Sequence, residues 1–147
     1  MHRKDFLRRS FAFAAACAMA GCAVEDPVST SIGKAVERGP GARVVLADHA
    51  TFPWGTACIF APYTTDGDVD AVTRVRGASR DAHDIAGRDD INLLMFVEQG
   101  RIVRSVAHRR DRGDFGPELA GKCFARDRAV FSVRTAPSGS RGTIGPG

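Results

Sequence analysis

The chain has 147 residues and a formal net charge of +4, from 21 basic and 17 acidic side chains. Four of these basic residues and one acidic residue lie within residues 1–21, so the rest of the chain has a net charge of only +1. This balance does not support nucleic-acid binding, which requires a sustained basic face, and no nucleic-acid partner is expected. The charge is uneven, at −5 over residues 22–100 and +6 over residues 101–147. Either the two halves neutralise each other in the fold, or a basic surface faces an anionic partner.

The amino end has the three parts of an export signal. Basic residues lie between Met1 and Arg9, an uncharged run of mostly Phe and Ala covers residues 10–20, and small residues precede Cys22. The apolar run is too short to span a bilayer, which takes about 20 residues. We therefore predict that residues 1–21 form a signal peptide.

The end of this segment, Met19-Ala20-Gly21-Cys22, resembles the lipobox of bacterial lipoproteins, with Met in place of the usual Leu. The resemblance implies that Cys22 becomes the amino terminus and carries the acyl chains, palmitate among them, that anchor the protein to a membrane. Ala23, rather than Asp, then implies the outer membrane, facing the periplasm. An ordinary signal peptide cut near Ala20 is the alternative. Arg8-Arg9-Ser10-Phe11 resembles part of the twin-arginine motif, so the export route stays open.

Both ends of the mature chain are rich in Pro and Gly. We predict a lipidated flexible tether over residues 22–42, with a reach of roughly 25 Å as a random coil. Residues 43–134 are predicted to form one small domain, and residues 135–147 a disordered tail.

Within this domain the elements follow in chain order. The predicted elements are strands at 43–47 and 57–61, a helix at 65–76, a polar loop at 79–90, a hairpin of strands 91–97 and 102–107, a loop at 113–121 and a strand at 129–133. Thr65 and Asp68 can form a capping box at the helix start, and Gly77 can end the helix. The hairpin turns at Gln99-Gly100. We predict an α+β fold in which one antiparallel sheet, in the order β-β-α-β-β-β, packs one helix on a face.

Three stretches of this domain resemble a family of small uncharacterised exported bacterial proteins. They are Pro53-Trp54 followed by Cys58-Ile59-Phe60-Ala61-Pro62-Tyr63-Thr64, the run at 90–97, and Cys123-Phe124 leading to the run at 127–131. The resemblance implies a domain type without a known chemistry.

The four cysteines divide by position. Cys17 leaves with the signal peptide and Cys22 takes the lipid, which leaves Cys58 and Cys123 as an even pair in an oxidising compartment. A bridge between them closes a loop of 65 residues and stabilises the fold by roughly 4 kcal/mol in the chain-entropy model. We predict this disulfide, with buried free thiols or one reactive thiol as alternatives.

Several motifs in the sequence imitate known sites. Asp66-Gly67-Asp68-Val69-Asp70 resembles the start of a calcium loop but lacks the later Gly and Glu, and acidic residues at a helix start explain it. Ser31-x-x-Lys34 lies in the predicted tether and is ascribed to chance. A thiol site of Cys58, His49 and Asp48 is weakened by the apolar strand around Cys58. The histidines lack metal-site spacing, so no metal ion or cofactor is expected.

The candidate binding residues are basic or aromatic. Arg109, Arg110 and Arg112 form the most charged stretch, which is either a solvated loop or a site for an anionic surface. Trp54 and Tyr63, the only residues of their types, lie on either side of the second strand. They either pack in the core or form an aromatic binding patch.

These observations leave three hypotheses for the mature domain. The first is a non-catalytic domain that binds another envelope component, because no catalytic or metal constellation is complete. The second is a periplasmic inhibitor of a secreted or cell-wall enzyme, because the size, the lipid anchor and the single disulfide resemble those of known lysozyme-inhibiting lipoproteins. The third is a hydrolase with dispersed residues, which clustered His, Asp and Cys in an open cleft would favour.

Overall fold

The computed structural model describes residues 24–136 and 142–147, so the predicted signal peptide and Cys22 lie outside the described residues. The α-helices are α1 (Pro27–Val36), α2 (Leu46–His49) and α3 (Asp66–Thr73). The strands are β1 (Arg43–Val45), β2 (Thr56–Phe60), β3 (Ile91–Glu98), β4 (Arg101–Arg109), β5 (Asp114–Phe115), β6 (Lys122–Ala125), β7 (Val130–Arg134) and β8 (Thr143–Pro146). Short 3-10 helices are η1 (Ala78–Asp81), η2 (Ile85–Gly87), η3 (Arg110–Arg112), η4 (Pro117–Leu119) and η5 (Arg126–Arg128).

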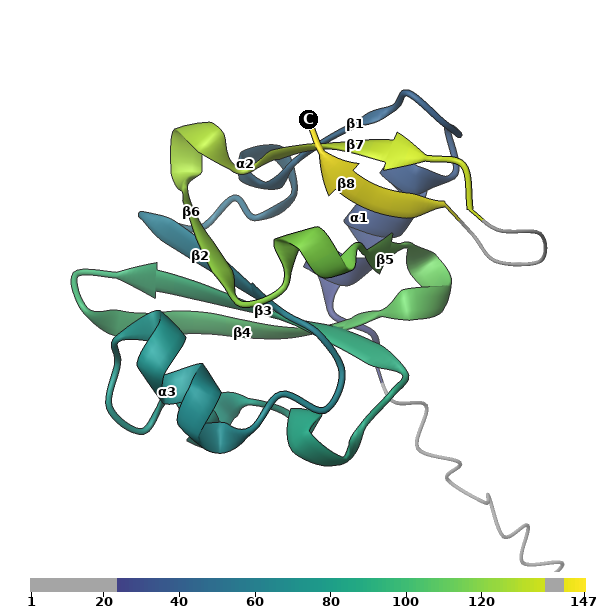
Figure 1. Cartoon of the computed structure of the whole chain (residues 1–147). Helices are drawn as coiled ribbons and strands as arrows, with labels where there is room; N and C mark the ends of the chain where they lie inside the picture. Colours follow the sequence, from purple (N-terminus) through teal and green to yellow (C-terminus); the bar gives the residue numbers. More distant parts are fainter. Residues whose placement is uncertain (1–23, 137–141) are drawn as a thin grey trace, which may run out of the picture.

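The strands form two four-stranded sheets (Figure 1). Sheet A has the order β1-β7-β8-β5 and is antiparallel except for the parallel pair β5–β8. Sheet B has the order β4-β3-β2-β6 and is antiparallel throughout. The mixed helix and antiparallel sheet content of the prediction is confirmed. The single sheet with one helix is wrong, because sheet A recruits two short strands, β5 and β8, from segments too short and too rich in Gly to show a strand period.

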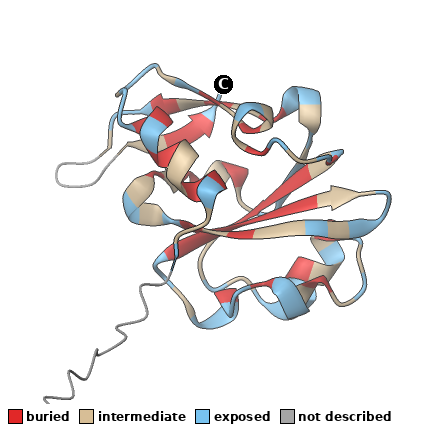
Figure 2. Cartoon of the chain, turned by 180° about the vertical axis from the view of Figure 1, so that it is seen from behind, coloured by how far each residue is buried: buried red, intermediate tan, exposed pale blue. Residues whose placement is uncertain are grey.

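Strand β3 separates two hydrophobic cores. Ile91, Leu93 and Met95 pack into one core with residues of α3, η1 and η2, while Leu94 and Phe96 face the other core, shared with α1 and sheet A. Successive side chains of a strand point to opposite faces, so an unbroken apolar run is compatible only with burial on both sides. Figure 2 shows this strand buried over most of its length, between layers that carry the exposed residues.

The two clearest predicted elements are confirmed with small shifts. β3 and β4 form the predicted hairpin, and both turn residues have positive φ, 47° at Gln99 and 71° at Gly100. α3 begins at the predicted cap, where the Thr65 hydroxyl oxygen accepts from the backbone N–H of Asp68 at 3.2 Å. It ends at Thr73 because Arg74 adopts the left-handed conformation, three residues before Gly77.

The predicted flexible tether is wrong where it covers α1. Asp26 caps this helix by accepting from the N–H of Val28 at 2.8 Å, and Pro27 fills the first turn. Six of the ten residues are buried. Gly33 is a packing residue here, because a Cβ at this position would lie 3.2 Å from the Arg112 side chain of η3. The Gly, Ser and Thr residues that led to the prediction of a flexible tether are therefore residues of a helix that packs closely against its neighbours.

The predicted disordered tail is wrong over β8. This strand pairs with β7 and β5, and Ile144 is fully buried. The glycines permit close approach, since a Cβ on Gly142 would lie 2.6 Å from Val133 and one on Gly147 would lie 2.8 Å from the Val130 carbonyl oxygen. Residues 137–141 of the predicted tail lie outside the described residues.

Because Ile144 is enclosed between β5 and β7, Ile144→Ala is expected to lower the free energy of unfolding by about 2–4 kcal/mol. Chemical denaturation at neutral pH measures this loss. Pro146→Ala, at an exposed position of the same strand, is the matched control and should change stability by less than about 1 kcal/mol. Equal effects of the two changes would contradict the buried position of β8.

Candidate functional site

Trp54 is a core residue. Its side chain is 3% exposed, its indole N–H donates to the Ala50 carbonyl oxygen at 2.9 Å, and the Arg126 guanidinium lies 4.8 Å from its ring centroid. Tyr63, in contrast, is 61% exposed. The two aromatic residues therefore do not form a shared binding patch, because one of them is enclosed by the protein.

The arginines that were predicted to face an anionic partner are all paired with carboxylates of the same chain. Arg110 donates to both carboxylate oxygens of Asp114, at 2.9 and 2.6 Å. Arg109 pairs with Asp111, and Arg112 donates to Glu25 at 3.1 Å. This stretch is accordingly neutralised within the fold, and Arg112 has the further role of joining η3 to the segment before α1.

Unusual backbone conformations gather where two loops meet. Tyr63, His83 and Asp84 have positive φ values of 63°, 51° and 56°. The Tyr63 N–H donates to the Ile85 carbonyl oxygen at 3.0 Å, so the segment after β2 and the loop that contains His83 form one corner. The left-handed conformation costs roughly 1–2 kcal/mol for a residue with a Cβ, and such strain gathers at functional sites.

Two open clefts lie on either side of His83 in this corner. The first, of about 620 Å³, is lined by Asp66, Ser79, Arg80, Asp81, His83, Asp84, Ile102, Val103, Arg104 and Ser105. The second, of about 750 Å³, is lined by Val24, Glu25, Asp26, Pro27, His83, Arg88, Asp90, Ile91, Ala107, Arg109, Arg110 and Asp111. We call the two together the His83 groove; it follows β4 and the 78–90 loop.

His83 offers a free acceptor in the groove. Its Nε2 lies 3.3 Å from the Ser105 carbonyl oxygen, and because a carbonyl only accepts, the ring proton belongs on Nε2. Nδ1 is then an acceptor, and no hydrogen bond to it occurs among the described residues.

The open charges of the groove are mostly acidic. Within residues 24–136 and 142–147, no ion pair involves Asp66, Asp81 or Asp84. The arginines of the second cleft, in contrast, are paired, and that cleft is lined by four acidic and three basic side chains. Arg80 also lines the first cleft and has no ion pair among the described residues, so carboxylates outnumber free arginines there by three to one. The groove therefore offers mainly hydrogen-bond acceptors and carboxylates to a ligand, beside exposed Val103.

Two histidines, neither singled out as a packing residue by the sequence, attach α1 to its neighbours. His108 on β4 is fully buried; its Nε2 donates to the Gly113 carbonyl oxygen at 2.8 Å, and its Nδ1 accepts from the Ser29 hydroxyl at 2.9 Å. Burial lowers the pKa of His108 from 6.5 to about 4. A neutral imidazole with both nitrogens satisfied is the form that a buried position favours.

The second pair joins Ser31 of α1 to His49 of α2, with 2.7 Å between Oγ and Nδ1. Burial lowers the pKa of His49, so its ring is neutral at neutral pH and can accept the hydroxyl proton. This is the geometry of a nucleophile and a base. Ser31 and Lys34 also lie on one helix, as the Ser-x-x-Lys motif of penicillin-binding enzymes requires. Neither residue, however, lines any of the three clefts described here, so the pair is best understood as a contact between α1 and α2.

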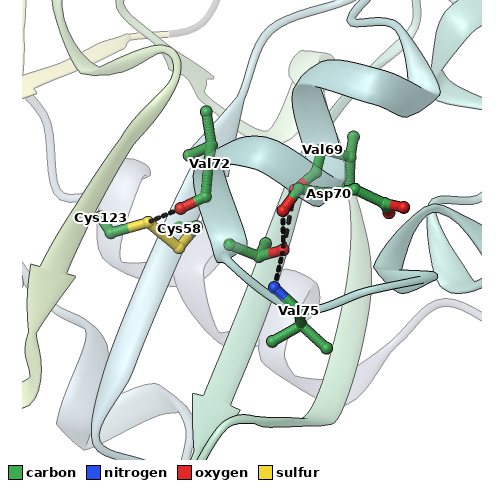
Figure 3. The surroundings of a disulfide bond; sticks show 7 residues. Cys58, Val69, Asp70, Val72, Val75 and Cys123 are labelled. Atoms are coloured by element: carbon green, nitrogen blue, oxygen red, sulfur yellow. Dashed lines mark hydrogen bonds between the residues drawn. A yellow bond between two sulfur atoms is a disulfide. The ribbon is translucent and has the colours of Figure 1, made fainter.

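The predicted disulfide between Cys58 and Cys123 is confirmed. The two residues are directly opposite each other in the antiparallel pair β2–β6, and β6 is the edge strand of sheet B. A third cleft, of about 460 Å³, is lined by Thr56, Cys58, Ala71, Val72, Thr73, Arg74, Val97, Gly121 and Cys123. Figure 3 shows the bridge beside α3, with Cys123 Sγ 3.5 Å from the Val72 carbonyl oxygen. The thiol site of Cys58, His49 and Asp48 is thereby excluded, because Cys58 is bonded to Cys123.

In the part of the chain that the structure describes, no three His, Cys, Asp or Glu residues are grouped to hold a metal ion. None of the helices described is both long and apolar enough to cross a membrane. Comparison of the chain with protein-family models, with characterised proteins and with solved structures finds no match. The function is therefore argued from the residues and their arrangement.

Sequence reasoning missed the His83 groove. The sequence predicts the 79–90 segment only as a polar loop, although that segment contains His83 and four Asp residues, at positions 81, 84, 89 and 90. Composition alone carried a weak signal, because only the fold brings the loop against β4.

Stability should depend on pH through His108. Its pKa is lower in the folded than in the unfolded state, so the unfolded chain binds the extra proton between these values. The stability that the neutral His108 ring contributes is fully present above pH 6.5 and is lost as the pH falls towards 4. At about 1.4 kcal/mol per pKa unit, the free energy of unfolding falls by about 3 kcal/mol over this range. Unfolding measured at pH 7, 5.5 and 4.5 should show this loss, and His108→Gln should flatten it.

Other groups titrate outside this window or add to it. A hydrogen bond from the Ser79 N–H is the main cause that lowers the pKa of Asp70 from 3.8, and one from the Arg88 side chain does the same for Asp90. The stability that these two carboxylates contribute is therefore lost only below pH 3.8. His49 acts in the same direction as His108 and leaves a residual slope in the variant. An unchanged slope in His108→Gln would contradict the assignment.

Proposed function

We propose that this chain is a bacterial envelope lipoprotein, anchored through Cys22, whose α+β domain is a non-catalytic module that binds another envelope protein through the His83 groove. The observation that carries the binding role is the groove itself. It combines two open clefts, two lining residues with positive φ, His83 and Asp84, and carboxylates that have no ion-pair partner in the described chain.

The proposed location is supported by the disulfide. Bridges such as Cys58–Cys123 persist in oxidising compartments and are rare in the cytosol. Export therefore accounts for the bridge, and it is the step that the amino-terminal sequence predicts.

The proposed anchor would lie close to the folded domain. Ion pairs join Glu25 to Arg112 and Asp26 to Arg104 at 3.1 and 2.8 Å, so the segment before α1 is attached to η3 and β4. Cys22 is three residues before Glu25, a span of at most about 11 Å at about 3.6 Å per residue. A lipid on Cys22 would thus hold the second cleft, which includes Val24 to Pro27, near the headgroups of the membrane.

The charge of the groove favours a protein partner over an anionic surface. The first cleft has three carboxylates without an ion pair in the described chain, at Asp66, Asp81 and Asp84, against one such arginine, Arg80. The arginines of the second cleft have carboxylate partners of their own. A partner segment with lysine or arginine side chains complements such a surface and is attracted to it at a distance.

Labelling of producing bacteria with a palmitate precursor tests the anchor. The full chain is expected to take the label, and Cys22→Ser is expected to lose both the label and membrane association, because no other thiol becomes the amino terminus. A Cys58→Ser and Cys123→Ser double variant is the matched control and should stay labelled. Label on Cys22→Ser would overturn the proposed anchor.

Photocrosslinking in intact cells tests the groove. A benzophenone side chain at Val103, which lines the first cleft, is expected to capture a specific envelope protein. The same group at exposed Arg128 of η5, outside the groove, should capture none. Asp81→Asn with Asp84→Asn should reduce the Val103 crosslink by about tenfold, from the loss of about 1.4 kcal/mol of binding energy. Equal crosslinking from both positions would contradict the proposed site.

A further inference from the structure

The two sulfurs of the disulfide lie in different surroundings. Cys58 on β2 is 1% exposed and packs with Phe60, Leu93 and Met95 in the core beneath α3. Cys123 on edge strand β6 is an exposed residue. A reagent in solution therefore meets the bridge from the side of Cys123.

The cleft beside the bridge provides room for such a reagent. Its volume is about 460 Å³, and both cysteines line it together with Arg74, a guanidinium that no described ion pair neutralises. Polar Thr56 and the carbonyl oxygen of Val72, 3.5 Å from Cys123 Sγ, add hydrogen-bonding groups. The cleft suits a small thiol that carries carboxylates, because Arg74 attracts the negative charge of such a molecule and of its thiolate.

We propose that Cys123 is a site of reversible thiolation by low-molecular-weight thiols of the glutathione type. The thiolate attacks Cys123 Sγ, a new S–S bond forms to that atom, and the Cys58–Cys123 bond breaks. The electron pair of the broken bond goes to Cys58 Sγ, which then takes a proton from water. Access is one determinant of which sulfur of a disulfide is attacked, and here it favours Cys123, because Cys58 is buried.

The fold retains β6 after the bridge opens. The ladder between β2 and β6 pairs Ala57 with Phe124 and Ile59 with Lys122. The Phe124 ring also packs edge-on against Phe131 of β7, with 5.1 Å between centroids. The adduct is therefore formed on the folded domain, and attack by the released Cys58 thiol regenerates the bridge.

Mass spectrometry of the oxidised full chain, treated with reduced glutathione and quenched in acid, tests the proposal. Peptide mapping is expected to find the glutathione adduct on Cys123 at least about tenfold more than on Cys58, at a protein concentration and temperature where the domain stays folded. An adduct mainly on Cys58, equal adducts on both, or none until denaturant is added would overturn it.

A matched pair of variants gives a second measurement. Both variants are made in a chain that also carries Cys17→Ser and Cys22→Ser, so that Cys58→Ser leaves Cys123 as a single thiol and Cys123→Ser leaves Cys58. Each is treated with an aromatic disulfide reagent without denaturant. The exposed thiol of Cys58→Ser is expected to react about 100-fold faster, because the thiol of the other variant is enclosed by the core. Circular dichroism checks that both variants fold. Where one does not, the adduct map of the unchanged chain decides, since it needs no substitution.

Discussion

The whole domain depends on a strand that is buried on both faces. β3 has six consecutive buried residues, so its alternate side chains must be covered by two separate layers. α3 and the 78–90 loop cover one face, and α1 with sheet A covers the other. Small domains bury a modest fraction of their surface. Because alternate side chains of the central strand enter two different cores, both faces of the strand are removed from water.

Polar contacts add to the apolar packing of the second layer. Ser29 and His108, both buried, form a hydrogen bond between α1 and β4, and the ion pairs of Glu25 and Asp26 attach the segment before α1. A buried polar group without a partner costs about 1–3 kcal/mol, so these contacts specify where the helix sits as much as they stabilise it. The same contacts hold Glu25 and Asp26 at the second cleft of the His83 groove.

The covalent bridge and the groove lie on the α3 side of sheet B. Cys58 belongs to the core that α3 covers, while the 78–90 loop, packed on the same core, forms a wall of the groove. An opening of the bridge at Cys123 removes a covalent link between β2 and β6 and leaves the pairing of β3 with β4, the strand that lines the groove, unchanged. Binding and thiolation can therefore be tested independently of each other.

The sequence by itself determined the features that depend on local or pairwise chemistry: the hairpin at Gln99-Gly100, the capped helix after Thr65 and the pairing of Cys58 with Cys123. Turn and cap residues act on their immediate neighbours, and a single cysteine pair remains once Cys17 is assigned to the proposed signal peptide and Cys22 to the proposed lipid. Only the tertiary structure decided that α1 and β8 are ordered, since Gly33 and Gly142 have meaning only once Arg112 and Val133 lie against them. The groove was decided in the same way, because His83 and Val103, 20 residues apart, meet only when the loop folds onto β4.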